Sequence, residues 1–213
     1  MSAAPRLRLV SVERFERDVK LRLPFRFGVI TVTEATQAVI RVAIEVEGGG
    51  TATGVAAETL AAKWFDKNLA LSDDQNLDQL RQALDVAIAI YRGQGSKTAF
   101  GLFADGYLEQ MAQGMALGLN PLVASYGPAL LDRAILDALG RATGKSFAQM
   151  VQANLPGMAV TTLTPDLQGF DLPGFLAGLR PGASIEVRHT VGLVDPIVAA
   201  DQPAEHRVND GLP

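Results

Sequence analysis

Residues 93–98, Gly-Gln-Gly-Ser-Lys-Thr, have the composition of the end of a phosphate-binding loop. In that motif, backbone N–H groups and a Lys hold phosphates where a strand turns into a helix. Here Ser96 separates the glycine from Lys97, the glycine required five residues earlier is missing, and the preceding residues have a helical pattern. The spacing therefore favours a turn between two helices over nucleotide binding.

Side chains for metal or nucleophilic catalysis are few. The chain has no cysteine and no Gly-x-Ser-x-Gly motif, which excludes thiolate chemistry and disfavours a serine hydrolase. The two histidines, His189 and His206, are not spaced to place two metal ligands on one helical face. Asp195, Asp201 and Asp210 could bind a hard cation, but in a turn-rich segment Asp more commonly forms turns. We expect no catalytic residue and no metal ligand in the chain.

Two segments beside expected strands carry the best candidates for ligand contact. Residues 23–29 place Phe25, Arg26 and Phe27 in a non-repeating segment that we predict as a loop. Aromatic side chains beside an Arg are suited to contact a ligand. An equally good interpretation is that these side chains form hydrophobic contacts with the helices. The second segment, residues 54–65, ends in Lys63, Trp64 and Phe65.

Three antiparallel strands should position these segments. Apolar residues repeat at every second position over residues 7–15, 38–46 and 51–57, which is typical of strands covering a core on one side. Glycines at positions 48–50 adopt positive φ without a steric cost and turn the second strand into the third. The pattern predicts a small antiparallel meander.

The period then changes to about 3.6, which predicts a helical bundle. Ser72 or Asp73 caps the first helix, and Asn120 caps the third, in which residues 127–128 (Gly-Pro) should form a kink or a break. Gly114 and Gly118 in the second helix should let another backbone approach closely. The expected helices run to Tyr91 with a stop at Gly93, over residues 98–119, from Asn120 to Gly140, and over residues 147–153 after a Ser146 cap.

A domain boundary is expected near residue 154, where Pro, Gly and Thr become frequent. Residues 1–153 then form an α+β domain, and residues 154–213 form a linker with one further strand, 185–188. His189 and Thr190 follow that strand and are candidates for lining a site, although a lone His is more often structural. A strand without a partner leaves backbone groups unpaired, so this segment looks like the start of a domain that is not supplied.

Composition and charge narrow the class of protein. With 48% apolar and 20% charged residues, the chain should be globular. It contains no apolar run long enough for a membrane span or a signal peptide, so we expect a cytoplasmic protein without a membrane partner. Residues 1–26 hold seven Lys or Arg against three acidic residues. These alternate with apolar residues as on a solvated strand face, so we expect no nucleic-acid partner.

The order of elements, together with three segments, resembles the enolase superfamily in its mandelate racemase and muconate lactonizing branch. Residues 24–28 resemble the loop after the first strand, residues 54–65 the second loop that closes over the site, and residues 134–145 the end of the capping bundle. Residues 185–190 look like the first barrel strand. The resemblance covers about residues 7–190. It implies an N-terminal capping domain followed by the first strand of an absent or truncated TIM-like barrel.

The resemblance also implies a reaction for the complete enzyme, the removal of a proton next to a carboxylate with Mg²⁺ assistance by a racemase, cycloisomerase or acid-sugar dehydratase. The Mg²⁺ ligands and the acid and base residues would belong to the barrel, so the chain alone should need no cofactor and should not be catalytic. We expect a carboxylate-containing small-molecule substrate and a homo-oligomer; a stand-alone binding or scaffold module is the alternative. The candidate substrate-binding residues are Phe25, Arg26, Phe27, Thr31, Lys63, Trp64, His189 and Thr190.

Overall fold

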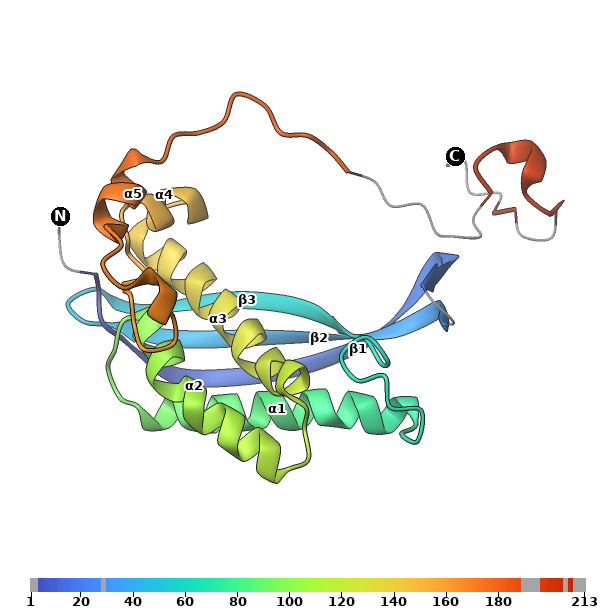
Figure 1. Ribbon diagram of the computed structural model, residues 1–213, viewed down its shortest axis with the longest axis horizontal. Coiled ribbons are helices and arrows are strands. Elements are labelled where there is room, and N and C mark those ends of the chain that lie inside the picture. Colours follow the sequence, from blue (N-terminus) through green and yellow to red (C-terminus); the bar gives the residue numbers. More distant parts are fainter. Residues whose placement is uncertain (1–3, 28–29, 189–195, 205–206, 209–213) are drawn as a thin grey trace.

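The computed structural model describes residues 4–27, 30–188, 196–204 and 207–208, which form an α+β fold (Figure 1). Its three antiparallel strands lie in the order β1, β2, β3, as predicted. Helices cover one face of this sheet (Figure 1). The strands are β1 (Leu7–Phe27), β2 (Ile30–Val46) and β3 (Gly50–Leu60). The helices are α1 (Asp73–Gly93), α2 (Ala99–Ala116), α3 (Pro121–Thr143), α4 (Phe147–Gln152) and α5 (Leu172–Gly178), with 3₁₀ turns η1 (Pro165–Leu167) and η2 (Ala199–Asp201).

All three strands are longer than predicted, and this corrects the loop expected at residues 23–29. The described part of that segment, up to Phe27, belongs to β1 and pairs with β2. The register of the pair shifts between Lys20 and Phe25, although apolar residues occupy every second position from Val19 to Phe27. Pro24 is compatible with this pairing because β1 lies at the edge of the sheet, where a residue without an N–H is tolerated.

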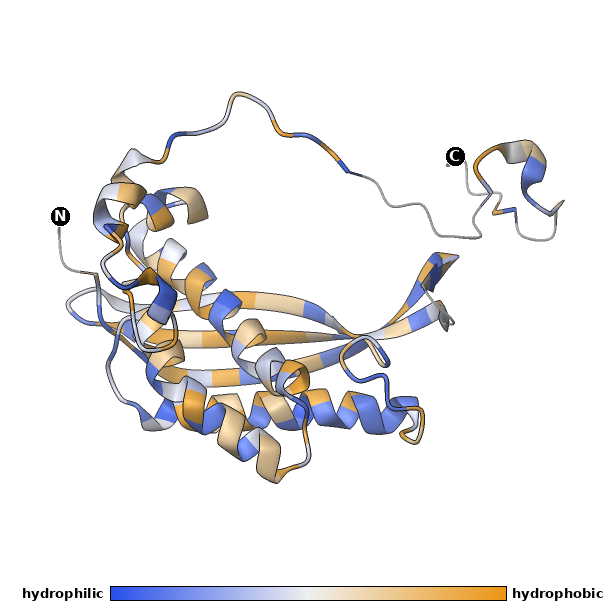
Figure 2. Cartoon of the chain, viewed as in Figure 1, coloured by the Kyte–Doolittle hydropathy of each residue, from blue (hydrophilic) through white to orange (hydrophobic). Residues whose placement is uncertain are grey.

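The core lies between the inner face of the sheet and the helices. Alternate residues of β2 are buried, as the alternation predicts, and Figure 2 shows apolar residues interrupted by polar ones along the strands. They pack in one cluster with residues of α1 and α3. The fully buried side chains at the centre of this cluster include Ile40, Val42, Ile44, Leu80, Leu130 and Ile135.

The predicted helix starts are confirmed by their capping hydrogen bonds. Ser72 and Ser146 each form a capping box with the Gln three residues later, and Thr98 and Asn120 accept bonds from backbone N–H groups of the first turn. These four side chains satisfy donors that the helices cannot satisfy internally.

Two predicted helix ends are wrong, and of the kink or break expected at residues 127–128 the break does not occur. Gly118 has a φ of 75° and stands after α2, which ends at Ala116. Helix α3 continues past Gly140 to Gly144, whose φ of 61° is the left-handed conformation that ends helices. Pro128 lies inside α3 without dividing it. Gly114 does allow a close approach, because a Cβ there would lie 2.8 Å from the Cβ of Ala124.

The predicted strand at residues 185–188 is also wrong. In the described part of the chain this segment has no strand partner, and Ile185 and Val187 are 90% and 89% exposed. A β-strand needs a neighbour to satisfy its backbone groups, and residues 180–188 instead extend away from the helices (Figure 1). His189 and Thr190 lie outside the described residues, as do His206, Asp195 and Asp210.

Candidate functional site

The far end of the β1–β2 pair projects beyond the rest of the sheet. β3 pairs with β2 only from Val46 back to Thr36, whereas β2 continues to Ile30 paired with β1. We call residues 19–27 and 30–35 the hairpin arm (Figure 1). A two-stranded ribbon cannot bury both of its faces, and Leu21, Leu23 and Phe25 are exposed on it. The arm therefore offers apolar side chains to a partner or ligand.

The connection between β3 and α1, residues 61–72, lies at the same end of the sheet. Lys63 has a positive φ of 59°, and its ammonium donates to the backbone carbonyls of Asn68 and Leu71 and lies 3.9 Å from Asp73 Oδ1. Its side chain is only 11% exposed. Two hydrogen bonds and one ion pair thus direct the ammonium group into its own loop, so Lys63 holds the loop in shape.

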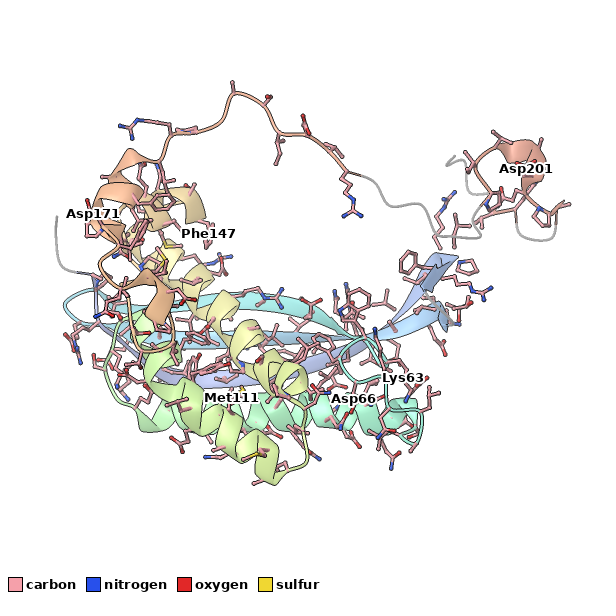
Figure 3. The ribbon with its side chains drawn as sticks, viewed as in Figure 1. Lys63, Asp66, Met111, Phe147, Asp171 and Asp201 are labelled. Atoms are coloured by element: carbon pink, nitrogen blue, oxygen red, sulfur yellow. The ribbon has the colours of Figure 1, made fainter. Side chains whose placement is uncertain are left out.

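Further contacts fix this loop to the helices. The ring of Phe65 meets Tyr126 edge to face at a centroid distance of 5.4 Å, and the Asn120 amide donates to the Phe65 carbonyl over 3.2 Å. Asp66 accepts from Gln79 of α1 over 3.3 Å, and Figure 3 shows Lys63 and Asp66 together beside the start of α1. The loop is therefore a preformed wall that needs no ordering when a ligand binds.

A cleft of about 570 Å³ lies between the hairpin arm and this loop. Four threonines are among the residues that line it, together with charged residues of both signs. Hydroxyls and ammonium groups are donors for a carboxylate or for sugar hydroxyls. The lining includes Lys20, Thr31, Thr33, Thr36, Thr59 and Lys63.

The structure brings together two of the predicted site residues, Thr31 and Lys63, in this cleft. Phe25 and Arg26 lie on β1 opposite Val32 and Thr31, and neither lines the cleft. Trp64 follows Lys63 and is 58% exposed. The side chain of Phe27, like His189 and Thr190, is outside the described part of the structure.

Residues 93–98 form the turn that the sequence predicts between α1 and α2. Leu7 and Lys97 exchange backbone hydrogen bonds of 2.7 and 3.0 Å, which ties this turn to the start of β1. The Lys97 ammonium pairs with Asp105 of α2. The lysine of the glycine-rich segment thus serves in an ion pair within the fold.

Another cavity, of about 360 Å³, separates β1 from α1. Two ion pairs cross it, Arg14 with Asp85 and Arg81 with Glu16. Arg81 donates to both Glu16 oxygens, over 2.8 and 2.7 Å, and these hydrogen bonds lower the pKa of the Glu16 carboxyl. Both pairs join β1 to α1, one with its basic residue on β1 and the other with its acidic residue there.

Sequence reasoning missed a pair between α1 and α3 in which the Tyr91 side chain is buried and Asp132 is partly buried. The Tyr91 hydroxyl donates to Asp132 Oδ1 over 2.8 Å, and burial raises the pKa of Asp132 to about 7, while that hydrogen bond acts in the opposite direction. The sequence signal was available. Asp132 stands next to Leu131 and one turn before Ile135 and Leu136, where a charge is unexpected.

Among known proteins, no family model and no curated protein sequence matches the chain. None of the described helices combines the length and apolar content needed to cross a bilayer. In the described ranges, no group of three or more His, Asp or Glu side chains is placed to hold a metal ion.

Proposed function

We propose that the chain is the capping and specificity part of an enzyme of the enolase superfamily that acts on a carboxylate. The observation that carries the proposal is the cleft between the hairpin arm and residues 61–72, because both walls extend from the same end of the sheet. These walls contain residues 24–27 and 61–65, which belong to the two segments, 24–28 and 54–65, that the resemblance marks as loops over a substrate. The likeness of residues 134–145 to the end of the capping bundle supports the same proposal.

The cleft supplies binding groups for such a substrate. Lys20 and the threonine hydroxyls would bind a carboxylate or neighbouring hydroxyls, and the arm would cover the bound molecule and exclude water. In the complete enzyme Mg²⁺ would stabilise the charge that develops when the proton leaves. The described residues offer no ligand set for this ion, so its site and the base belong, in this proposal, to a barrel encoded with the chain.

The experiment begins with the reading frame that encodes the chain. The complete protein encoded by this frame should catalyse the exchange of a substrate proton next to a carboxylate for deuterium. ¹H NMR over a panel of hydroxy acids and sugar acids measures this exchange, and chelation of Mg²⁺ should stop it. Thr31→Val should lower kcat/KM about tenfold, the effect of one lost hydrogen bond to a charged group. The matched control Thr51→Val, at the other end of β3, should not. A frame that stops after Pro213, or a full product without exchange, would overturn the proposal.

A stand-alone binding module is the second candidate, and the closed core favours it. The buried cluster runs from Leu7 to Met150. A domain with its own core folds without a barrel. In this case the 213-residue chain binds a carboxylate in the cleft without magnesium, with an affinity that Thr31→Val reduces. Isothermal titration with and without the ion separates the two candidates.

A further inference from the structure

A separate cavity of about 160 Å³ lies among α2, α3, α4 and residues 156–158. It shares no lining residue with the cleft, and Figure 3 shows Phe147 beside it at the opposite end of the molecule from Lys63. We call it the aromatic pocket. Each helix contributes two residues four positions apart, which share one helical face. These pairs are Ala99 and Phe103, Asp132 and Leu136, and Phe147 and Val151.

The outer wall of the aromatic pocket is fixed in place. The Asn154 side chain, on a residue with a φ of 51°, bonds to both backbone groups of Met158 over 2.7 and 2.9 Å. The Phe100 N–H donates to the Pro156 carbonyl over 2.8 Å. Gly157 sits so close to Thr98 that a Cβ would lie 2.6 Å from its side chain. The pocket is therefore preformed, as ligand pockets usually are.

Asp132 is the charged group in this apolar lining. Among the described residues its one hydrogen-bond partner is Tyr91, which bonds to Oδ1 and leaves Oδ2 unpaired. A carboxylate among apolar side chains is costly unless a second donor or a cation pairs with it. Burial raises the pKa of Asp132 to about 7, and Oδ2 is not fully buried, so a molecule in the pocket can reach it.

We propose that the aromatic pocket binds a small protonated arylalkylamine, with its ring among the Phe side chains and its ammonium on Asp132 Oδ2. The volume fits one ring, since an engineered apolar cavity of about 150 Å³ binds benzene. The faces of Phe100 and Phe103, whose centroids are 6.2 Å apart, would add attraction to the cation. This site is independent of the proposed function of the cleft.

The test uses the full chain and two probes of equal size, benzylamine and benzyl alcohol, in ¹⁵N NMR titrations at about pH 8, where an ordinary amine is protonated. We expect benzylamine to shift the amide signals of Phe100, Phe103 and Leu136 and to bind at least tenfold more tightly than benzyl alcohol, the ratio for one charge-assisted hydrogen bond. Asp132→Asn should remove this preference. Glu109→Gln, which removes an exposed charge from α2 outside the pocket, should keep it.

Equal affinity for the two probes in the unaltered protein would overturn the proposal, and that comparison requires no variant to fold. Shifts confined to the cleft, at Thr31 or Thr59, would overturn it as well. Both results leave the proposed function of the cleft unaffected, because that function is measured by proton exchange.

Discussion

Asp132 should make the stability of the protein depend on pH. Its pKa is raised to about 7 in the folded state, above the ordinary value of 3.8, so the folded protein binds this proton more tightly than the unfolded chain. Stability from this group is therefore complete below about pH 4 and decreases as the pH rises to about 7. We expect Asp132→Asn to be more stable than the wild type at pH 8 by up to about 3 kcal/mol, and much less so at pH 4.

Urea unfolding followed by circular dichroism at several pH values measures this difference. Glu109→Gln is the matched control, because it removes an exposed carboxylate without touching Asp132. Parallel pH profiles for Asp132→Asn and the wild type would contradict the expectation.

Tyr91 and Tyr126 form a natural pair for testing what a buried hydroxyl contributes. The Tyr91 hydroxyl donates a hydrogen bond to the Asp132 carboxylate. Within the described residues, the buried Tyr126 hydroxyl has no hydrogen-bond partner. Tyr91→Phe should cost about 1–3 kcal/mol at pH 8, because it leaves a partly buried carboxylate without its donor. Tyr126→Phe should be neutral within about 0.5 kcal/mol or stabilising. Chemical unfolding measures the free energy of unfolding of both variants. Equal losses of stability would show that the hydrogen bond to Asp132 contributes no more than the unpaired hydroxyl of Tyr126.

At the scale of elements, glycines set how closely α3 packs. A Cβ on Gly127 would lie 2.1 Å from the Ala83 carbonyl oxygen of α1. Helix propensity alone predicts that Gly127→Ala gains about 1 kcal/mol, but the clash with a rigid backbone should reverse the sign and cost more than about 2 kcal/mol. Gly93→Ala is the control, because no described atom lies within 4 Å of its Cβ position, and it should gain about 0.5 kcal/mol. Thermal unfolding of the two variants gives the comparison, and a more stable Gly127→Ala protein would contradict it.

The elements that could be predicted from the sequence are those with local signals. Ser72 and Ser146, each with a Gln three residues later, mark helix starts, and the alternation in residues 38–46 marks the central strand. The hairpin arm also alternates apolar and polar residues from Val19 to Phe27, but Pro24 within it is typical of both loops and edge strands, so the sequence does not decide between them. Long-range pairing between two strands decides its shape.

The same distinction applies to the candidate site. Thr31 and Lys63 were both predicted as binding residues, and the structure places them in one cleft. The two residues lie in one cleft because β1 and β2 extend beyond the end of β3. No local sequence pattern encodes this difference in strand length. The contacts that occupy the Lys63 ammonium come from the carbonyls of its own loop, and a sequence does not reveal which backbone oxygens turn inward.

For the whole molecule, the exposed leucines of the hairpin arm should cause self-association. Exposed apolar patches on soluble proteins commonly mark interaction sites. Sedimentation velocity should show a sedimentation coefficient that rises with concentration, and the double variant Leu21→Ser, Leu23→Ser should reduce this rise. Leu108→Ser removes an exposed leucine from α2 and should leave it unchanged. A wild-type protein that stays monomeric at all concentrations would contradict the expectation.

Residues 181–188 should be the first site of proteolysis. In the described structure this segment is exposed and has neither helix nor strand, and proteases cut such segments first. Thermolysin should cleave before Ile185 or Val187 and leave a resistant fragment that contains β1 to α5, identified by its mass. First cuts within β1–β3 or α1–α3 would show instead that the core opens more readily than this segment.

The order of the elements has a consequence for the ribosome. Translation delivers the sheet first and α3, which covers both β2 and β3, about 80 residues after β3 ends. At about 5–20 residues per second this delay is on the order of 10 s. During this delay no α3 helix covers the inner face of β2, which includes Ile40, Val42 and Ile44. The nascent chain should therefore bind ribosome-associated chaperones until α3 has left the exit tunnel.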